Sequence, residues 1–159
     1  MIRMNELKYV DSHMDDLISD LQLLIRQPSV SAKNEGIEEC AKLVKTLLTS
    51  AGLKSEILRL KKGVAPIVFA EIKSKSNPDK TLMFYNHYDV QPADPLELWT
   101  SGPFEPVIKK TPLHPEGAIF ARGACDDKGQ MYMHVKAFEL MMNTETLPCN
   151  VKFMIEGEE

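Results

Sequence analysis

Hydrophobic positions along the chain follow two periods, one typical of helices and one typical of strands. Apolar residues recur every three or four positions in residues 14–26 and 37–50 and again after Gly129, which predicts three amphipathic helices. Shorter alternating or continuous apolar segments predict strands at residues 55–60, 67–72, 82–89, 118–120 and 151–159. Helices and strands that alternate in this way favour an α/β fold, with a mixed β-sheet flanked by helices.

Helix-limiting residues refine the first two helices. Ser12 and Asp15 are spaced like a capping box at the start of residues 14–26, and Pro28 forces the end of that helix. Gly52 predicts the end of the second helix. Beside the apolar face of the third helix, His134 is interpreted as a hydrogen-bonded packing histidine rather than a catalytic one.

The strand at residues 82–89 leads directly into a histidine and an aspartate. His87 and Asp89 are two residues apart, so in an extended chain both side chains point the same way. An imidazole that binds a metal through one nitrogen is commonly oriented by a carboxylate that accepts a hydrogen bond from the other nitrogen. The pair therefore suits a metal site, although such a pair alone is a weak signal.

Two other segments end in acidic residues. Asp126 and Asp127 follow the apolar residues 118–120 and precede a helix, where an ordinary N-cap is the simpler interpretation for a single aspartate. Glu158 and Glu159 end the last predicted strand, where a solvated turn is the simpler one. Open α/β sheets place ligand sites at the carboxyl ends of their strands, so the coincidence favours one shared site.

Composition excludes several classes of function. The 159 residues carry a net charge of −4 with acids and bases interspersed, which argues against a nucleic-acid partner. No segment is apolar enough for a membrane span or a secretory leader, and neither a P-loop nor a G-x-G-x-x-G motif is present. Three widely spaced cysteines indicate reduced thiols and a cytoplasmic protein, and Cys125 is interpreted as a packing residue.

Residues 91–117 form a long, Pro-rich connection, whose length inside a compact domain suggests function. Trp99 is expected to anchor this connection by burying its ring. Residues 111–117 are expected to lengthen a surface hairpin that exposes His114.

Several motifs together resemble those of the M20 metallopeptidases, most closely the cytosolic dipeptidase and carnosinase branch. They are HYDVQP at 87–92, LWTSGPFEP at 98–106, ARGACDDKGQ at 121–130 and IEGEE at 155–159. The resemblance covers essentially the whole chain and departs from the family pattern at residues 111–117, where a short turn is usual.

The resemblance implies a site with two divalent metal ions, zinc or alternatively manganese. His87 and Asp126 match metal ligands of the family, and Asp126 matches the carboxylate that bridges the two ions. Asp89 matches the aspartate that orients the site, and Asp127 is then a neighbour rather than a ligand. Thiolate ligands are not required, because imidazole and carboxylate groups suit zinc and manganese.

The family's general base is the first glutamate of an acidic pair, and this chain stops within that element. Glu159 is the expected base, because a further glutamate is typical of this branch. Glu158 would be the base and Glu159 a ligand if the chain turned directly. The expected reaction is hydrolysis of dipeptides or short peptides by a water that the metals activate. The alternatives are an N-acyl amino acid amidohydrolase of the same family and a non-catalytic binding module.

The resemblance also implies that residues 1–159 are the amino-terminal part of one catalytic domain. The remaining metal ligands and a lid or dimerisation domain are expected beyond residue 159. The chain alone is then expected to be inactive, and the full-length protein is expected to form a homodimer that takes small peptide substrates.

Overall fold

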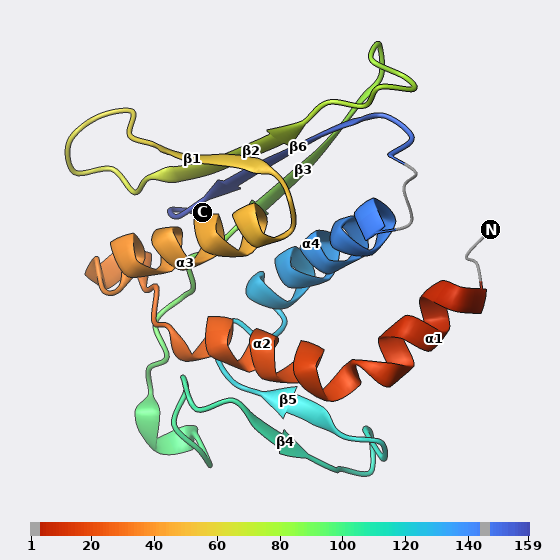
Figure 1. Cartoon of the computed structure of the whole chain (residues 1–159). Coiled ribbons are helices and arrows are strands. Elements are labelled where there is room, and N and C mark those ends of the chain that lie inside the picture. Colours follow the sequence, from red (N-terminus) through yellow and green to blue (C-terminus); the bar gives the residue numbers. More distant parts are fainter. Residues whose placement is uncertain (1–3, 144–146) are drawn as a thin grey trace.

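The computed structural model describes residues 4–143 and 147–159, and it has the predicted α/β architecture of a mixed sheet packed against helices (Figure 1). The helices are α1 (Met4–Ser12), α2 (Met14–Arg26), α3 (Ile37–Ser50) and α4 (Lys128–Asn143), with short 3₁₀ turns η1 (Ser31–Lys33) and η2 (Leu96–Leu98). The strands are β1 (Lys54–Leu58), β2 (Ile67–Ile72), β3 (Thr81–His87), β4 (Val107–Lys109), β5 (Ala118–Phe120) and β6 (Asn150–Glu156).

The main sheet has the strand order β1-β2-β6-β3. Strands β1 and β2 are antiparallel, as are β2 and β6, whereas β3 runs parallel to β6. The parallel register aligns His87 with Glu156, so the last residues of β3 and β6 lie side by side. This shared carboxyl edge is where the sequence predicted a site.

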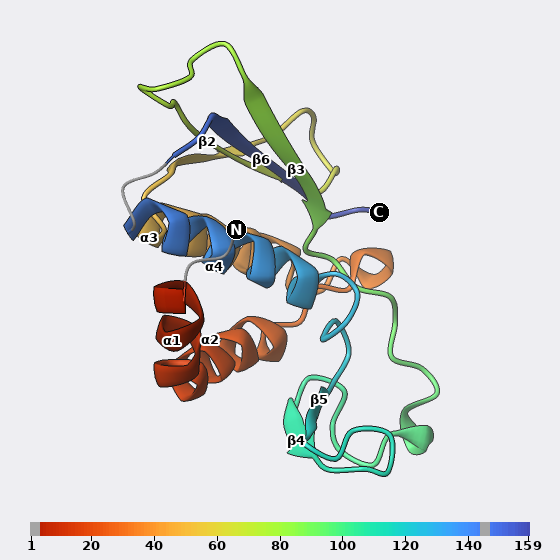
Figure 2. The same cartoon turned by 90° about the vertical axis from the view of Figure 1, so that its right-hand side faces the viewer.

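Helices α3 and α4 cover one face of the main sheet, and α2 packs beneath them (Figure 2). The hydrophobic core lies between these helices and the sheet. It is formed by fully buried apolar side chains from α3, α4, β2 and β6, among them Cys40, Val44, Leu48, Val68, Met131, Val135, Phe138, Phe153 and Ile155. Burial of these amphipathic faces is what stabilises helices of this length.

The predicted bounds of α2, α3 and β2 are confirmed. The capping box is wrong, because Ser12 is the last residue of α1 and donates its hydroxyl to the carbonyl of Tyr9, 3.0 Å away. His13 stands at the N-cap of α2 without a capping side-chain hydrogen bond. Gly52 follows α3 with a φ of 89°, a left-handed conformation that suits glycine.

The long connection folds back as the small antiparallel hairpin of β4 and β5, set apart from the main sheet (Figure 2). Trp99 is only half-buried rather than buried as expected, and it is held by a hydrogen bond from its Nε1 to the carbonyl of Ala93 at 2.8 Å. His114 is exposed, as predicted, but Cys125 is exposed too, so its interpretation as a packing residue is wrong.

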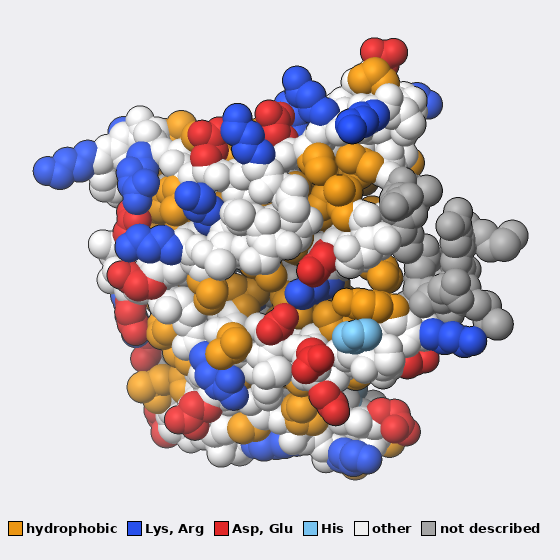
Figure 3. All heavy atoms as spheres, in the orientation of Figure 1, with side chains coloured by type: hydrophobic (Ala, Val, Ile, Leu, Met, Phe, Trp, Pro, Cys, Tyr) orange, Lys and Arg blue, Asp and Glu red, His pale blue; other side chains and the backbone are white. Residues whose placement is uncertain are grey.

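Positive and negative side chains are interspersed on the face shown in Figure 3. Within residues 4–143 and 147–159, no helix is long and apolar enough to cross a membrane.

Candidate active site

His87 is the last residue of β3, and its ring is oriented by Asp89 just beyond the strand. The His87 Nδ1 atom lies 3.3 Å from Asp89 Oδ1 and 3.2 Å from the Asp89 carbonyl oxygen. Because both oxygens accept hydrogen bonds, they favour a proton on Nδ1, which leaves Nε2 as the free electron-pair donor. The two side chains thus lie together at the end of β3, the direction that their spacing predicted.

The backbone between these two residues is held on several sides. Tyr88 is fully buried, its hydroxyl donates to the carbonyl of Pro66 at 2.7 Å, and its carbonyl accepts the hydroxyl of Ser29 at 2.7 Å. Its N–H donates to the carbonyl of Glu156 at 2.7 Å, which extends the pairing of β3 with β6 by one residue. Gly157 lies against the Tyr88 ring, where a Cβ atom would overlap the phenol. The Tyr88 side chain therefore fixes the turn that presents His87 and Asp89.

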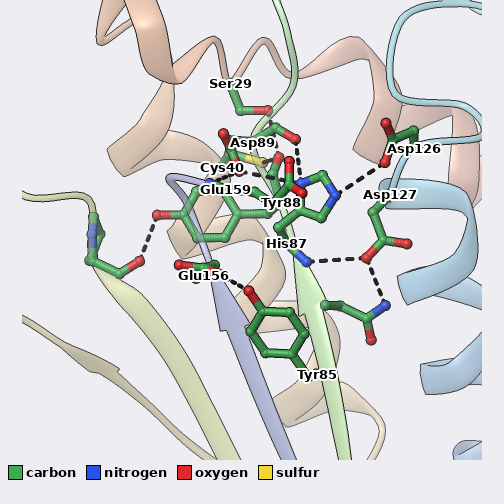
Figure 4. Close-up of polar contacts among 12 residues, drawn as sticks. Ser29, Cys40, Tyr85, His87, Tyr88, Asp89, Asp126, Asp127, Glu156 and Glu159 are labelled. Carbon is green, nitrogen blue, oxygen red and sulfur yellow. Dashed lines mark hydrogen bonds and ion pairs between the residues drawn. The ribbon is translucent and has the colours of Figure 1, made fainter.

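Asp126 and Asp127 stand at the start of α4 and point in different directions (Figure 4). Asp126 is largely exposed and places Oδ1 3.1 Å from His87 Nε2. Asp127 is buried and accepts two hydrogen bonds on Oδ2, from Asn86 Nδ2 at 2.8 Å and from the His87 backbone N–H at 3.1 Å. Asp126 thus faces the ring of His87, whereas Asp127 binds the backbone of β3 and the side chain of Asn86.

Glu158 and Glu159 follow β6 and have different surroundings. Glu159 lines a pocket together with His87, Asp89 and Asp126, and its backbone N–H lies 3.3 Å from Asp89 Oδ1. Glu158 instead places a carboxylate oxygen 3.5 Å from the backbone nitrogen of Ala65, next to β2. Val90, Gln91 and Arg122 complete the pocket.

The carboxylates around His87 control its charge. Partial burial lowers the pKa of the imidazole, but the negative charges of Asp127, Asp89 and Asp126 outweigh burial, so the pKa is raised above its ordinary value. The same negative field attracts a cation, and a metal that binds Nε2 must displace the proton from that atom.

The residues present fit one edge of a metal centre. Two donor atoms bound to one tetrahedral zinc at about 2.0–2.1 Å lie about 3.3 Å apart, close to the 3.1 Å between His87 Nε2 and Asp126 Oδ1. An imidazole nitrogen and a carboxylate oxygen are also the donors that zinc and manganese accept. Within the described part of the chain, however, no three His, Cys, Asp or Glu side chains gather closely enough to hold a metal ion.

Sequence reasoning found the residues at the strand ends but missed their supports. Asn86 contacts Asp127, and Arg122 lines the pocket, although neither residue stood out in the sequence. Asn86 directly precedes His87 in β3, so its side chain points to the opposite face of the strand, where α4 packs.

Residues 83–159 match the model of peptidase family M20/M25/M40. The four motifs lie within this match, so the resemblance to the M20 peptidases is confirmed.

Among individual proteins, the chain is 29% identical over 168 residues to Beta-Ala-His dipeptidase from Homo sapiens, matching 96% of this chain and 32% of that protein. It is 33% identical over 121 residues to succinyl-diaminopimelate desuccinylase from Variovorax paradoxus, matching 73% of this chain and 28% of that protein. The chain thus spans about a third of the length of these curated relatives.

The fold of this chain is also similar to that of solved M20 structures. The crystal structure of Sso-CP2, an M20 family metallo-carboxypeptidase from Sulfolobus solfataricus, superposes with a TM-score of 0.80 and 38% identity. The superposition covers 90% of this chain and 31% of that one. The mixed sheet and its helices are therefore part of an M20 catalytic fold.

Proposed function

We propose that this chain is the amino-terminal part of a metallopeptidase that hydrolyses dipeptides or other short peptides. The observation that carries the proposal is the pair of donors His87 Nε2 and Asp126 Oδ1, which face each other at 3.1 Å while Asp89 orients the imidazole. The similarity to a dipeptidase over 96% of the chain supports the substrate class.

His87 and Asp126 would hold the metal ions, zinc or manganese. Two bound divalent ions would supply Lewis acidity, lowering the pKa of a water molecule and polarising the scissile carbonyl. Asp89 would keep the His87 ring in the orientation that binding requires, because it is buried and its carboxylate lies beside Nδ1.

Glu159 would act as the general base. Its place in the pocket with His87 and Asp126 supports this role, and the contact of Glu158 with Ala65 directs the preceding carboxylate away from the pocket. In this role Glu159 takes a proton from the attacking water and returns it to the amine that leaves.

The complete site would need residues beyond this chain, because His87 and Asp126 are fewer ligands than zinc usually takes from a protein. We therefore place residues 1–159 in the amino-terminal part of one catalytic domain that is inactive alone. We further propose a homodimeric full-length enzyme in the cytoplasm, where the free thiols of Cys40, Cys125 and Cys149 would stay reduced.

The second candidate is hydrolysis of N-acyl amino acids, since one relative is a desuccinylase. Both reactions cleave an amide bond and would use the same metal ligands and base. Comparison of dipeptides with N-acyl amino acids as substrates of the full-length protein distinguishes them.

Replacement of His87 tests the metal-dependent mechanism. In the full-length protein, His87→Ala should abolish the activity that metal restores after chelation, while circular dichroism shows an intact fold. The exposed His114→Ala is the matched control and should keep its activity. Near-normal turnover by His87→Ala would contradict the assignment of His87 as a metal ligand.

A further inference from the structure

Asp127 belongs to a buried hydrogen-bonded network that the proposed mechanism does not use. Asn86 Nδ2 donates to Asp127 Oδ2 at 2.8 Å, and His134 Nδ1 lies 3.2 Å from Asn86 Oδ1. Only 4% of Asn86 and 9% of Asp127 are exposed, so water competes little for these bonds. The network therefore joins Asn86, near the end of β3, to Asp127 just before α4 and to His134 within α4.

The spacing of these residues lets one helix hold Asn86 from two sides. Asp127 and His134 are seven residues apart, close to two turns of an α-helix, so they lie on the same face. The Asp127 carbonyl already accepts from the N–H of Met131 at 2.9 Å, which makes Asp127 part of the first turn. The two hydrogen bonds of the Asn86 amide therefore limit the movement of α4 along β3.

The network also determines where its protons lie. An ionised carboxylate only accepts hydrogen bonds, so Asn86 must turn its nitrogen to Asp127 and its oxygen to His134. That oxygen is an acceptor as well, and the Nδ1 atom of His134 must then carry a proton. The ring of His134 is packed against Phe84, with centroids 4.9 Å apart, which helps to hold this orientation.

Asp127 connects the network to the donors of the candidate metal centre. The same Oδ2 atom that binds Asn86 accepts the His87 backbone N–H at 3.1 Å, and Asp127 is the direct neighbour of Asp126 (Figure 4). A shift of Asp127 would change the 3.1 Å separation between His87 Nε2 and Asp126 Oδ1.

We propose that Asn86 and His134 are positioning residues of this site, acting through Asp127 to set His87 against Asp126. The proposal rests on the proposed function, because it assumes that these two donors bind metal. It assigns a role to the histidine of α4 that neither touches the metal nor takes part in proton transfer.

A matched pair of substitutions separates the hydrogen bond from packing. His134→Phe keeps a ring against Phe84 but has no donor, whereas His134→Asn keeps a donor nitrogen as many bonds from Cα as Nδ1 and loses the ring. In the full-length protein, zinc or manganese affinity is measured by competition with a chromogenic chelator, with the exposed His114→Phe as the control.

We expect His134→Phe to weaken metal binding by about tenfold, the lower end of the cost of removing such outer contacts, and His134→Asn to recover most of that loss. Equal affinity of wild type and His134→Phe would overturn this inference alone, as would equal losses in both variants. Absence of metal binding by the wild type would overturn the proposed function and, with it, this role.

The proton position gives a test that needs no folded His134→Phe variant. Two-bond ¹H–¹⁵N spectra of the wild-type protein at pH 8 should show a proton on His134 Nδ1, with His134→Asn used to assign the signal. A bare Nδ1 would overturn the network.

Discussion

Glu158 and Glu159 show how adjacent residues of one type can differ in role. Glu159 faces the pocket, whereas Glu158 lies against Ala65. We predict that Glu159→Gln lowers kcat on a dipeptide by about 10²–10⁴-fold, the usual contribution of a general base, and that Glu158→Gln changes kcat little. Steady-state kinetics of the metal-loaded full-length protein measure both. The reverse order would make Glu158 the base.

Gly157 is required by its closeness to Tyr88. A methyl group at this position would overlap the phenol, which is itself held by the carbonyl of Pro66. Gly157→Ala should therefore lower the free energy of unfolding by about 1–3 kcal/mol, the usual cost of overpacking. Urea denaturation checks this value, and an unchanged midpoint would show that the Tyr88 ring can move aside freely.

The placement of a single side chain was predictable from sequence where the alternation along a strand determines the direction in which it points. The side chains of His87 and Asp89 could be predicted to point the same way, because the two residues are two positions apart in an extended segment. Asp126 needed the family resemblance, since a lone aspartate before a helix is usually only a cap. Asn86 and His134 could not be paired, because their contact depends on how α4 packs against β3.

At the scale of elements, a buried lysine connects α4 to the end of α2. The Lys128 ammonium is fully buried and donates to the carbonyls of Gln27 at 2.5 Å and Leu24 at 3.4 Å. Burial lowers the pKa of Lys128 below its ordinary value of 10.5, although its interactions with Cys40 and Asp89 oppose the shift.

This lowered pKa has a definite consequence for stability. Between the folded pKa and 10.5, the unfolded chain binds more protons than the folded one, so stability rises with pH in that interval. We predict that the unfolding free energy of the wild type, measured relative to Lys128→Met, increases as pH rises towards 10.5. Denaturant titrations at several alkaline pH values measure this difference, and a decrease would contradict the burial of a titrating amine.

The longer elements agree with prediction because their amphipathic pattern is also their packing pattern. Helix α3 buries Ile37, Cys40, Ala41, Val44 and Leu48, which recur at the helical period. Leu47, which the same period also selected, is only half-buried. Helix α1 was not predicted, since nine residues are too few for a pattern alone to indicate a helix.

At the scale of the whole molecule, the fold class was predictable but the order of strands was not. The last strand, β6, is inserted between β2 and β3, so the sheet is completed only when α4 returns the chain to its centre. No local pattern records such a crossover. In Sso-CP2 the corresponding sheet belongs to a chain about three times as long as this one.

The most direct measurement is hydrolysis of dipeptides by the full-length protein, stripped with a chelator and then resupplied with zinc or manganese. The account predicts that activity is lost with chelator and returns with metal, and that residues 1–159 alone remain inactive. Hydrolysis by residues 1–159 alone would contradict the division of the site. No hydrolysis of dipeptides or N-acyl amino acids by the metal-loaded protein would contradict the catalytic account and favour a binding module.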